Sequence, residues 1–286
     1  MKENKNTPPC AVPLAGLSEK VPKLFGIPSG VPGLDELFFT FQFENDQVKR
    51  VPLNGLPSSA VIHLTGVPDT GKSLIGEQFS ITQASRGYNV LYVTVEIPAP
   101  FLAQSFIERS KALKVEWDNI KDRIFILDTV KYPELRDNVN NLCQILAETI
   151  ENKEINVTII DSITGLYEGR EMMARSVVRK LYEIMKKYYQ SAIFISQKRS
   201  SHEEASAEAA GGYAVPHIVD CTIVLSKIVL TSKAAATTYG RKPGEVLRTI
   251  RIDGCRMCGH DSRVHLLEIN EFGILQVGKP LAEVLR

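Results

Sequence analysis

Residues 66 to 73 follow the pattern G-x-x-x-x-G-K-S, which combines glycines with a lysine and a hydroxyl. Gly66 and Gly71 let the backbone curl without a Cβ in the way, so that several N–H groups can point at one anion. Lys72 adds a compact positive charge for β- and γ-phosphate oxygens, and Ser73 offers a hydroxyl to Mg²⁺. The pattern predicts a phosphate-binding loop, and the alternative is an ordinary glycine-rich turn. The expected nucleotide contacts come from the whole loop: Gly66, Val67, Pro68, Asp69, Thr70, Gly71, Lys72, Ser73 and Leu74.

Asp161 ends the apolar stretch 156–161, which is typical of a buried strand. In a parallel sheet the carboxyl end of this strand lies at the same edge as the phosphate loop. A carboxylate there can hold Mg²⁺, usually through water, so Asp161 and Ser73 are the predicted metal groups. The alternative is that Asp161 caps a helix beginning near Ser162.

Glu96 and Gln197 end two further predicted strands, 89–96 and 191–197. A carboxylate at Glu96 could orient and deprotonate the water that attacks a γ-phosphate; the alternative is a helix N-terminal carboxylate stabilised by the helix dipole. The amide of Gln197 could contact the γ-phosphate and signal its loss to the next loop, and the alternative is a polar strand end. With Lys72, these two residues are the predicted catalytic groups.

Arg251 and Arg256 lie in a late run of short strands. In a ring-shaped ATPase, an arginine of one subunit can stabilise transition-state charge on the neighbour's γ-phosphate. We expect Arg256 to be such a catalytic group, and the alternative for both residues is a solvating surface role.

The segment Cys255-x-x-Cys258-x-His260, with His265 nearby, has the spacing of half a zinc site. No second C-x-x-C completes it, so we expect reduced structural thiols, with a metal site as the alternative.

The elements that must position these groups alternate between strand and helix, which implies crossover units and a mostly parallel sheet. Residues 198–213 are small and polar and predict a mobile loop. The following short strands predict an antiparallel C-terminal extension. The predicted strands are 60–65, 89–96, 123–128, 156–161 and 191–197, and the predicted helices are 72–86, 98–113, 134–151 and 170–190.

The composition is that of an ordinary globular chain of 286 residues, 44% hydrophobic and 23% charged, with a net charge of +1. Its apolar runs are shorter than the roughly 18 residues of a membrane helix, and five scattered cysteines favour a reducing, cytoplasmic location. We expect residues 1–24 to form a flexible arm and 25–286 a single domain. Within that domain, 39–54 is an insertion predicted to form a hairpin or an extended excursion.

The motifs together resemble the RecA/KaiC family of hexameric or filamentous ATPases. The resemblance covers about residues 25 to 280. It implies a RecA-like P-loop NTPase core, ATP with Mg²⁺, Glu96 as base, Asp161 as the Walker B acid and a site completed between subunits of a homo-oligomeric, hexameric ring. Its carriers are GIPSGVPGLDELF, GVPDTGKS, the strand ending in Glu96, VTIIDSITGLYEG, the strand ending in SQ, GGYAVPHIVDCTIVLSK and RIDGCRMCGHDSRVHLLEINEFGI.

The chain also departs from this family. Clock KaiC proteins have two such domains and a phosphorylated Ser–Thr pair, where this chain has one domain with Pro216 and His217, so an autokinase cycle is not expected. Glu96 is followed by Ile97 rather than by a second acid. RadA-type recombinases carry an N-terminal DNA-binding domain that is absent here, and the loop 198–213 mixes basic residues with acids, which disfavours DNA. These charged loop residues are Lys198, Arg199, Glu203, Glu204 and Glu208.

The sequence therefore predicts a slow KaiC-like ATPase, without membrane attachment, whose nucleotide state controls assembly or a regulatory protein partner. One alternative is a RadA-type recombinase paralogue that binds single-stranded DNA. The other is a nucleotide-bound regulatory scaffold that does not hydrolyse ATP.

Overall fold

The computed structural model describes residues 14–15, 17, 21–198 and 215–284. The strands in this part of the chain are β1 (Gly26–Ile27), β2 (Phe38–Glu44), β3 (Gln47–Pro52), β4 (Leu56–Pro57), β5 (Val61–Gly66), β6 (Asn89–Thr94), β7 (Ile124–Asp128), β8 (Ile155–Asp161), β9 (Ser191–Gln197), β10 (Cys221–Val229), β11 (Val246–Cys255), β12 (Gly259–His260), β13 (His265–Ile269) and β14 (Leu275–Pro280). The α-helices are α1 (Lys72–Ser85), α2 (Ala99–Ala112), α3 (Pro133–Asp137), α4 (Val139–Asn152), α5 (Ala174–Lys187) and α6 (Lys233–Thr238).

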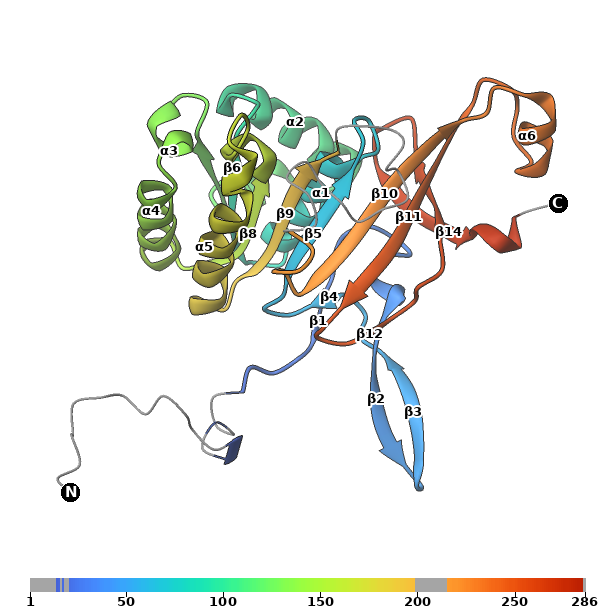
Figure 1. Ribbon diagram of the computed structural model, residues 1–286, viewed down its shortest axis with the longest axis horizontal. Coiled ribbons are helices and arrows are strands. Elements are labelled where there is room, and N and C mark those ends of the chain that lie inside the picture. Colours follow the sequence, from blue (N-terminus) through green and yellow to red (C-terminus); the bar gives the residue numbers. More distant parts are fainter. Residues whose placement is uncertain (1–13, 16, 18–20, 199–214, 285–286) are drawn as a thin grey trace.

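A nine-stranded sheet in the order β14-β13-β11-β10-β5-β9-β8-β6-β7 forms the centre of the molecule (Figure 1). All pairings from β10 to β7 are parallel, whereas β11, β13 and β14 are added antiparallel. This is the predicted architecture of a mostly parallel sheet with an antiparallel C-terminal extension.

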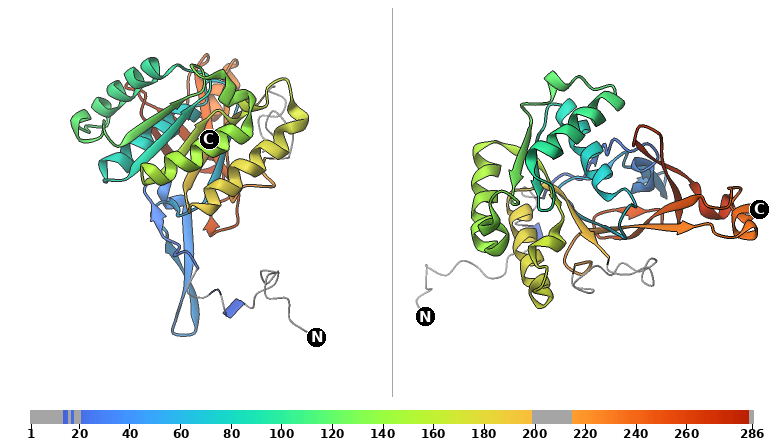
Figure 2. Two further views of the ribbon diagram at one scale, coloured as in Figure 1. Left: turned by 90° about the vertical axis from the view of Figure 1, so that its left-hand side faces the viewer. Right: turned by 90° about the horizontal axis from the view of Figure 1, so that it is seen from above.

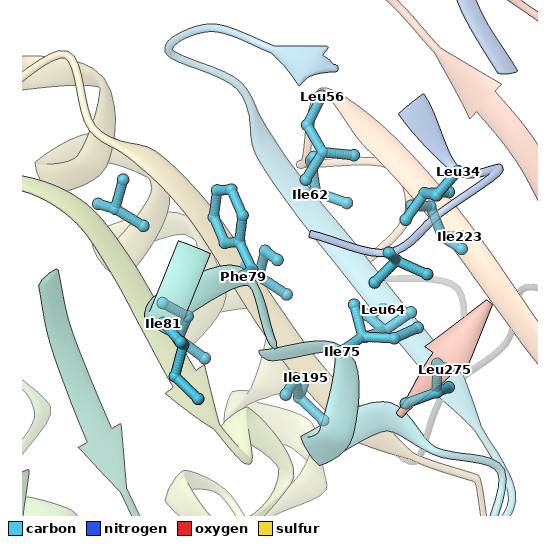
Figure 3. Close-up of a cluster of buried hydrophobic side chains, with 14 of the residues drawn as sticks. Leu34, Leu56, Ile62, Leu64, Ile75, Phe79, Ile81, Ile195, Ile223 and Leu275 are labelled. Atoms are coloured by element: carbon cyan, nitrogen blue, oxygen red, sulfur yellow. The ribbon is translucent and has the colours of Figure 1, made fainter. Parts of the chain in front are cut away.

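The central strands are mostly apolar and buried because helices cover both of their faces. Alternate residues of β5, β6, β8 and β9 belong to two separate buried clusters, one shared with α1 and α2 and the other with α4 and α5. Figure 3 shows the first cluster, where Ile62 and Leu64 of β5 pack beside Ile75 and Phe79 of α1. Figure 2 shows the helices on opposite sides of the sheet.

Most predicted boundaries agree with the structure to within two or three residues, but the predicted helix 134–151 is wrong. It is two helices, α3 and α4, separated at Asn138, which has extended backbone angles. The Asn138 side chain accepts hydrogen bonds from the N–H groups of Asn140 (3.1 Å) and Asn141 (3.2 Å) and so caps α4. The helix predicted from Arg170 begins only at Ala174, after a short 3₁₀ turn.

The insertion 39–54 forms a hairpin of β2 and β3, one of its two predicted alternatives. Its turn residues Asn45 and Asp46 have φ of 50° and 58°, as two-residue hairpin turns require. With β12 the hairpin makes a small separate sheet and points away from the body of the molecule (Figures 1 and 2). The predicted arm 1–24 and mobile loop 198–213 lie mostly outside the described residues. None of the described helices is both long and apolar enough to cross a membrane.

Replacing Asn138 by alanine should lower the free energy of unfolding by about 1 kcal/mol, because two N–H groups of α4 lose their acceptor. Asn138→Asp keeps an acceptor oxygen and should remain close to the wild type. The midpoints of urea unfolding measure both effects. Equal midpoints for the alanine and aspartate variants would contradict the capping role.

Candidate functional site

The phosphate loop joins β5 to α1 and is shaped by the C-terminal extension that packs against it. A Cβ on Gly71, whose φ is 98°, would lie 2.7 Å from Cδ2 of Leu275. A Cβ on Gly66 would lie 2.5 Å from the carbonyl oxygen of Leu225. Both positions therefore require glycine for space, and Gly71 requires it for backbone conformation as well.

Lys72 is buried beneath this loop with its ammonium group turned onto the loop's own backbone. Its Nζ donates to the carbonyl oxygen of Val67 (2.8 Å), which also accepts from Oγ1 of Thr70 (2.9 Å). Burial lowers the pKa of Lys72 to about 8, although the charges of Asp161 and Glu96 act in the opposite direction. The lysine is thus poorly solvated and is suited to gain a phosphate partner.

Asp161 and Ser73 lie beside each other at the carboxyl edge of the sheet, as predicted. Burial raises the pKa of Asp161, and hydrogen bonds from the hydroxyls of Ser73 and Tyr92 act in the opposite direction. The Tyr92 hydroxyl donates to Oδ2 of Asp161 at 2.8 Å. A carboxylate and a hydroxyl side by side are hard oxygen groups of the kind that Mg²⁺ prefers, so the residues fit this ion.

Glu96 is exposed and lies two residues beyond the end of β6, rather than within the strand as predicted. The hydroxyl of Ser162 donates to Oε1 of Glu96 at 2.7 Å. The side-chain amide of Gln197 donates to both carboxylate oxygens, at 2.8 and 3.0 Å. In this structure Gln197 therefore positions the predicted base.

These groups line one cleft of about 350 Å³ above the phosphate loop. The cleft contains residues from all three predicted classes: nucleotide, metal and catalytic. Its lining is Pro68, Asp69, Gly71, Lys72, Ser73, Leu74, Glu96, Asp161, Ile195, Gln197 and Ile269.

Arg256 is not part of this cleft. Its backbone N–H bonds to the carbonyl of Asp220, the residue just before β10, and its guanidinium donates to the carbonyl of His217 at 2.9 Å. This is the amino edge of the parallel sheet, opposite the phosphate loop. Arg251 lies within β11 and donates to Asp253 at 2.6 Å. A contact between either arginine and a γ-phosphate would have to involve another copy of the chain, and it stays a prediction.

The cysteines of the half zinc motif lie together, with the sulfurs of Cys255 and Cys258 at 3.6 Å. Both are free thiols, and Cys221 is a third free thiol beside Cys255. No group of three or more His, Cys, Asp or Glu side chains in the described parts of the chain is arranged to hold a metal ion.

Two cations that the sequence did not single out hold the loop residue Asp69. Arg248 of β11 donates to the backbone carbonyl (3.0 Å) and to Oδ2 (2.9 Å) of Asp69, and Lys227 of β10 donates to Oδ2 (3.3 Å). Partial burial would raise the pKa of Asp69, but these two partners lower it overall. Lys227 and Arg248 face each other across the β10–β11 ladder, where like charges are destabilising, and the carboxylate of Asp69 offsets their repulsion. The sequence could not predict these contacts of Asp69, because they depend on the register of β10 on β11.

Known proteins that are similar to this chain in sequence or in fold include KaiC-like proteins. A family model described as ATPase KaiC matches residues 27–281. A UPF0273 protein of Thermotoga maritima is 24% identical over 266 residues, 87% of this chain and 94% of the relative. UPF0273 protein PAE3143 of Pyrobaculum aerophilum is 26% identical over 258 residues, 86% of this chain and 80% of the relative. The crystal structure of KaiC-like protein PH0186 from Pyrococcus horikoshii has a TM-score of 0.67 at 22% identity and covers 90% of this chain and 100% of that chain, so the two share a fold.

The affinity for ATP should fall as the pH rises above about 8, because a neutral Lys72 must take up a proton when phosphate binds. The dissociation constant should approach about a tenfold rise per pH unit, the slope for uptake of one proton. Calorimetric titrations between pH 7 and pH 9 measure it. Lys72→Arg, which cannot titrate in this range, should bind more weakly but with a flat profile. The same slope in that variant would assign the proton to another group.

Arg248→Met should raise the ATP dissociation constant by about two- to fivefold, as expected for a partly exposed ion pair. The reason is that Asp69 then keeps only Lys227 as its charged partner. Arg241→Met is the matched control, because Arg241 is in the same extension but pairs with Glu268. Equal affinities of the two variants would contradict a positioning role for Arg248.

Proposed function

Because the chain belongs to the KaiC family of ATPases, we propose that it binds ATP with Mg²⁺ in the cleft above the phosphate loop and hydrolyses it. The observation that carries this proposal is the carboxylate of Glu96, which Ser162 and Gln197 hold at the cleft that Lys72 lines. A base fixed by two donors, next to a phosphate-binding loop, has the arrangement that attack of water on a γ-phosphate requires.

In this proposal the residues of the cleft bind the phosphates, activate water and hold the metal ion. The Nζ of Lys72 leaves the carbonyl of Val67 and donates to the phosphate oxygens instead. Glu96 orients the attacking water and accepts its proton on a carboxylate oxygen. Ser73 and Asp161 hold Mg²⁺, which neutralises charge on the β- and γ-phosphates when bound.

Turnover is slow in a single chain under this proposal. Lys72 is the one cation among the described residues that line the cleft, and Lys227 and Arg248 beside the loop are engaged with Asp69. Stabilisation of transition-state charge would then depend on an arginine of a neighbouring subunit, and we assign that role to Arg256. The expected assembly is a homo-oligomeric ring whose nucleotide state controls assembly or a regulatory partner.

Glu96→Gln should lower the rate of phosphate release by about 10²- to 10⁴-fold, the usual contribution of a general base. ATP binding should remain, because the variant keeps the loop and Lys72. Glu116→Gln, which changes an exposed carboxylate outside the cleft, is the matched control.

Three outcomes separate the alternatives. Tight ATP binding without turnover, unchanged by Glu96→Gln, would indicate a nucleotide-bound scaffold. Failure to bind ATP, with no effect of Lys72→Ala, would reject the proposal altogether. Light scattering with and without ATP, run beside the phosphate assay, tests the ring, and an unchanged mass would reject nucleotide-controlled assembly.

A further inference from the structure

The hairpin of β2 and β3, residues 38–52, is an amphipathic ribbon with an uncovered apolar face. Its register places Phe41 opposite Arg50 and Phe43 opposite Val48. Because side chains alternate along a strand, Phe39, Phe41 and Phe43 share one face with Val48. Phe43 is 83% exposed, Val48 58% and Phe41 56%.

The other face of the ribbon is mostly polar, with Thr40, Gln42, Glu44 and Lys49, and its one apolar residue beyond Phe38 is Val51 opposite Thr40. The ring of Phe41 stacks edge-to-face on that of Phe39, with centroids 5.5 Å apart, and the guanidinium of Arg50 covers Phe39 at 3.6 Å. The aromatic row is therefore ordered at its base and open toward its tip. A two-stranded ribbon is only marginally stable alone, and exposed apolar rows of this kind mark association surfaces.

A cavity of about 380 Å³, separate from the nucleotide cleft, lies at the amino edge of the parallel sheet. Residues at the start of β8 and β9 line it, together with aromatic side chains that remain exposed: Phe25 (54%), Tyr88 (42%) and Tyr189 (60%). Arg86 also lines it and has no ion pair with any residue that the structure describes. The proposed ATPase chemistry uses none of these groups.

The ribbon and this cavity lie at the same edge of the molecule. The ribbon joins the body through β12, which follows the end of β11 beside the amino end of β10, and it projects beyond that edge (Figure 1). A second copy that faces this edge across a two-fold axis would receive the ribbon and insert its own in return. One axis then satisfies both contacts, as in an isologous dimer.

We propose that two copies of this chain pair through their amino edges, each placing the Phe41–Phe43–Val48 face of its ribbon against the aromatic cavity of the other. Charge is complementary as well. The ribbon tip carries Asp46, which has no ion pair within the described residues, and the cavity offers Arg86. The phosphate loops lie at the opposite edges, so this pairing does not depend on nucleotide and uses none of the residues that line the nucleotide cleft.

The test is light scattering of the full-length protein without nucleotide, over a range of concentrations. The wild type should show twice the monomer mass, and Phe43→Ser or Val48→Ser should raise the dimer dissociation constant by roughly 10- to 100-fold, as for buried interface anchors. Gln42→Ala, on the opposite face of the same ribbon, is the matched control and should leave it unchanged. ATP binding should persist in the monomeric variants, which separates this result from a failure of the ATPase proposal.

A charge reversal identifies the partner surface. Arg86→Asp should weaken the dimer, and the double variant with Asp46→Arg should restore it. A monomeric wild type would overturn the proposal, as would a dimer that forms only with ATP. A dimer that survives both Arg86→Asp and Tyr189→Ala would also overturn it, because the ribbons would then be packing on each other rather than in the cavity.

Discussion

The parallel pairing of β5 with β10 is the contact on which the rest of the structure depends. At its amino end the carboxylate of Asp220 accepts from the N–H of Val61 (2.8 Å) and from Lys186 (3.0 Å), which fixes where β10 begins. The same register then places Leu225 against Gly66 and brings Lys227 beside Asp69. The phosphate loop is thus shaped on one side by the parallel core and on the other by the antiparallel extension.

Burial creates the chemistry of the cleft by disfavouring charge on both of its buried ionisable groups. It lowers the pKa of Lys72 and raises that of Asp161, so the charged form of each side chain is less stable in the cleft than it would be in water. The proposed nucleotide with Mg²⁺ would supply the missing partner for both at once. Glu96 differs because its side chain is exposed and is held by hydrogen bonds from Ser162 and Gln197.

The parallel core could be predicted from the sequence because buried strands and amphipathic helices have different hydrophobic periods, and the family resemblance is confirmed. The break at Asn138 was missed because the apolar spacing continues across it. The cap depends on the extended backbone and the side-chain hydrogen bonds of this one residue. The contacts of Asp69 were missed for a different reason. Lys227 and Arg248 are 21 positions apart in the chain, and only the register of β10 on β11 brings them together. Gln197 was placed correctly at the end of its strand. Its contact with Glu96 was not predicted, because it depends on the bend of the chain after β6.

Gln78 of α1 binds both backbone groups of Leu275, accepting from its N–H (2.7 Å) and donating to its carbonyl (3.2 Å). These partners are 197 positions apart, and Leu275 is also the residue that closes on Gly71. On a ribosome adding roughly 5–20 residues per second, β14 would be synthesised on the order of 10–40 s after Gln78. The nascent chain therefore carries an unfinished phosphate loop until β14 has been made.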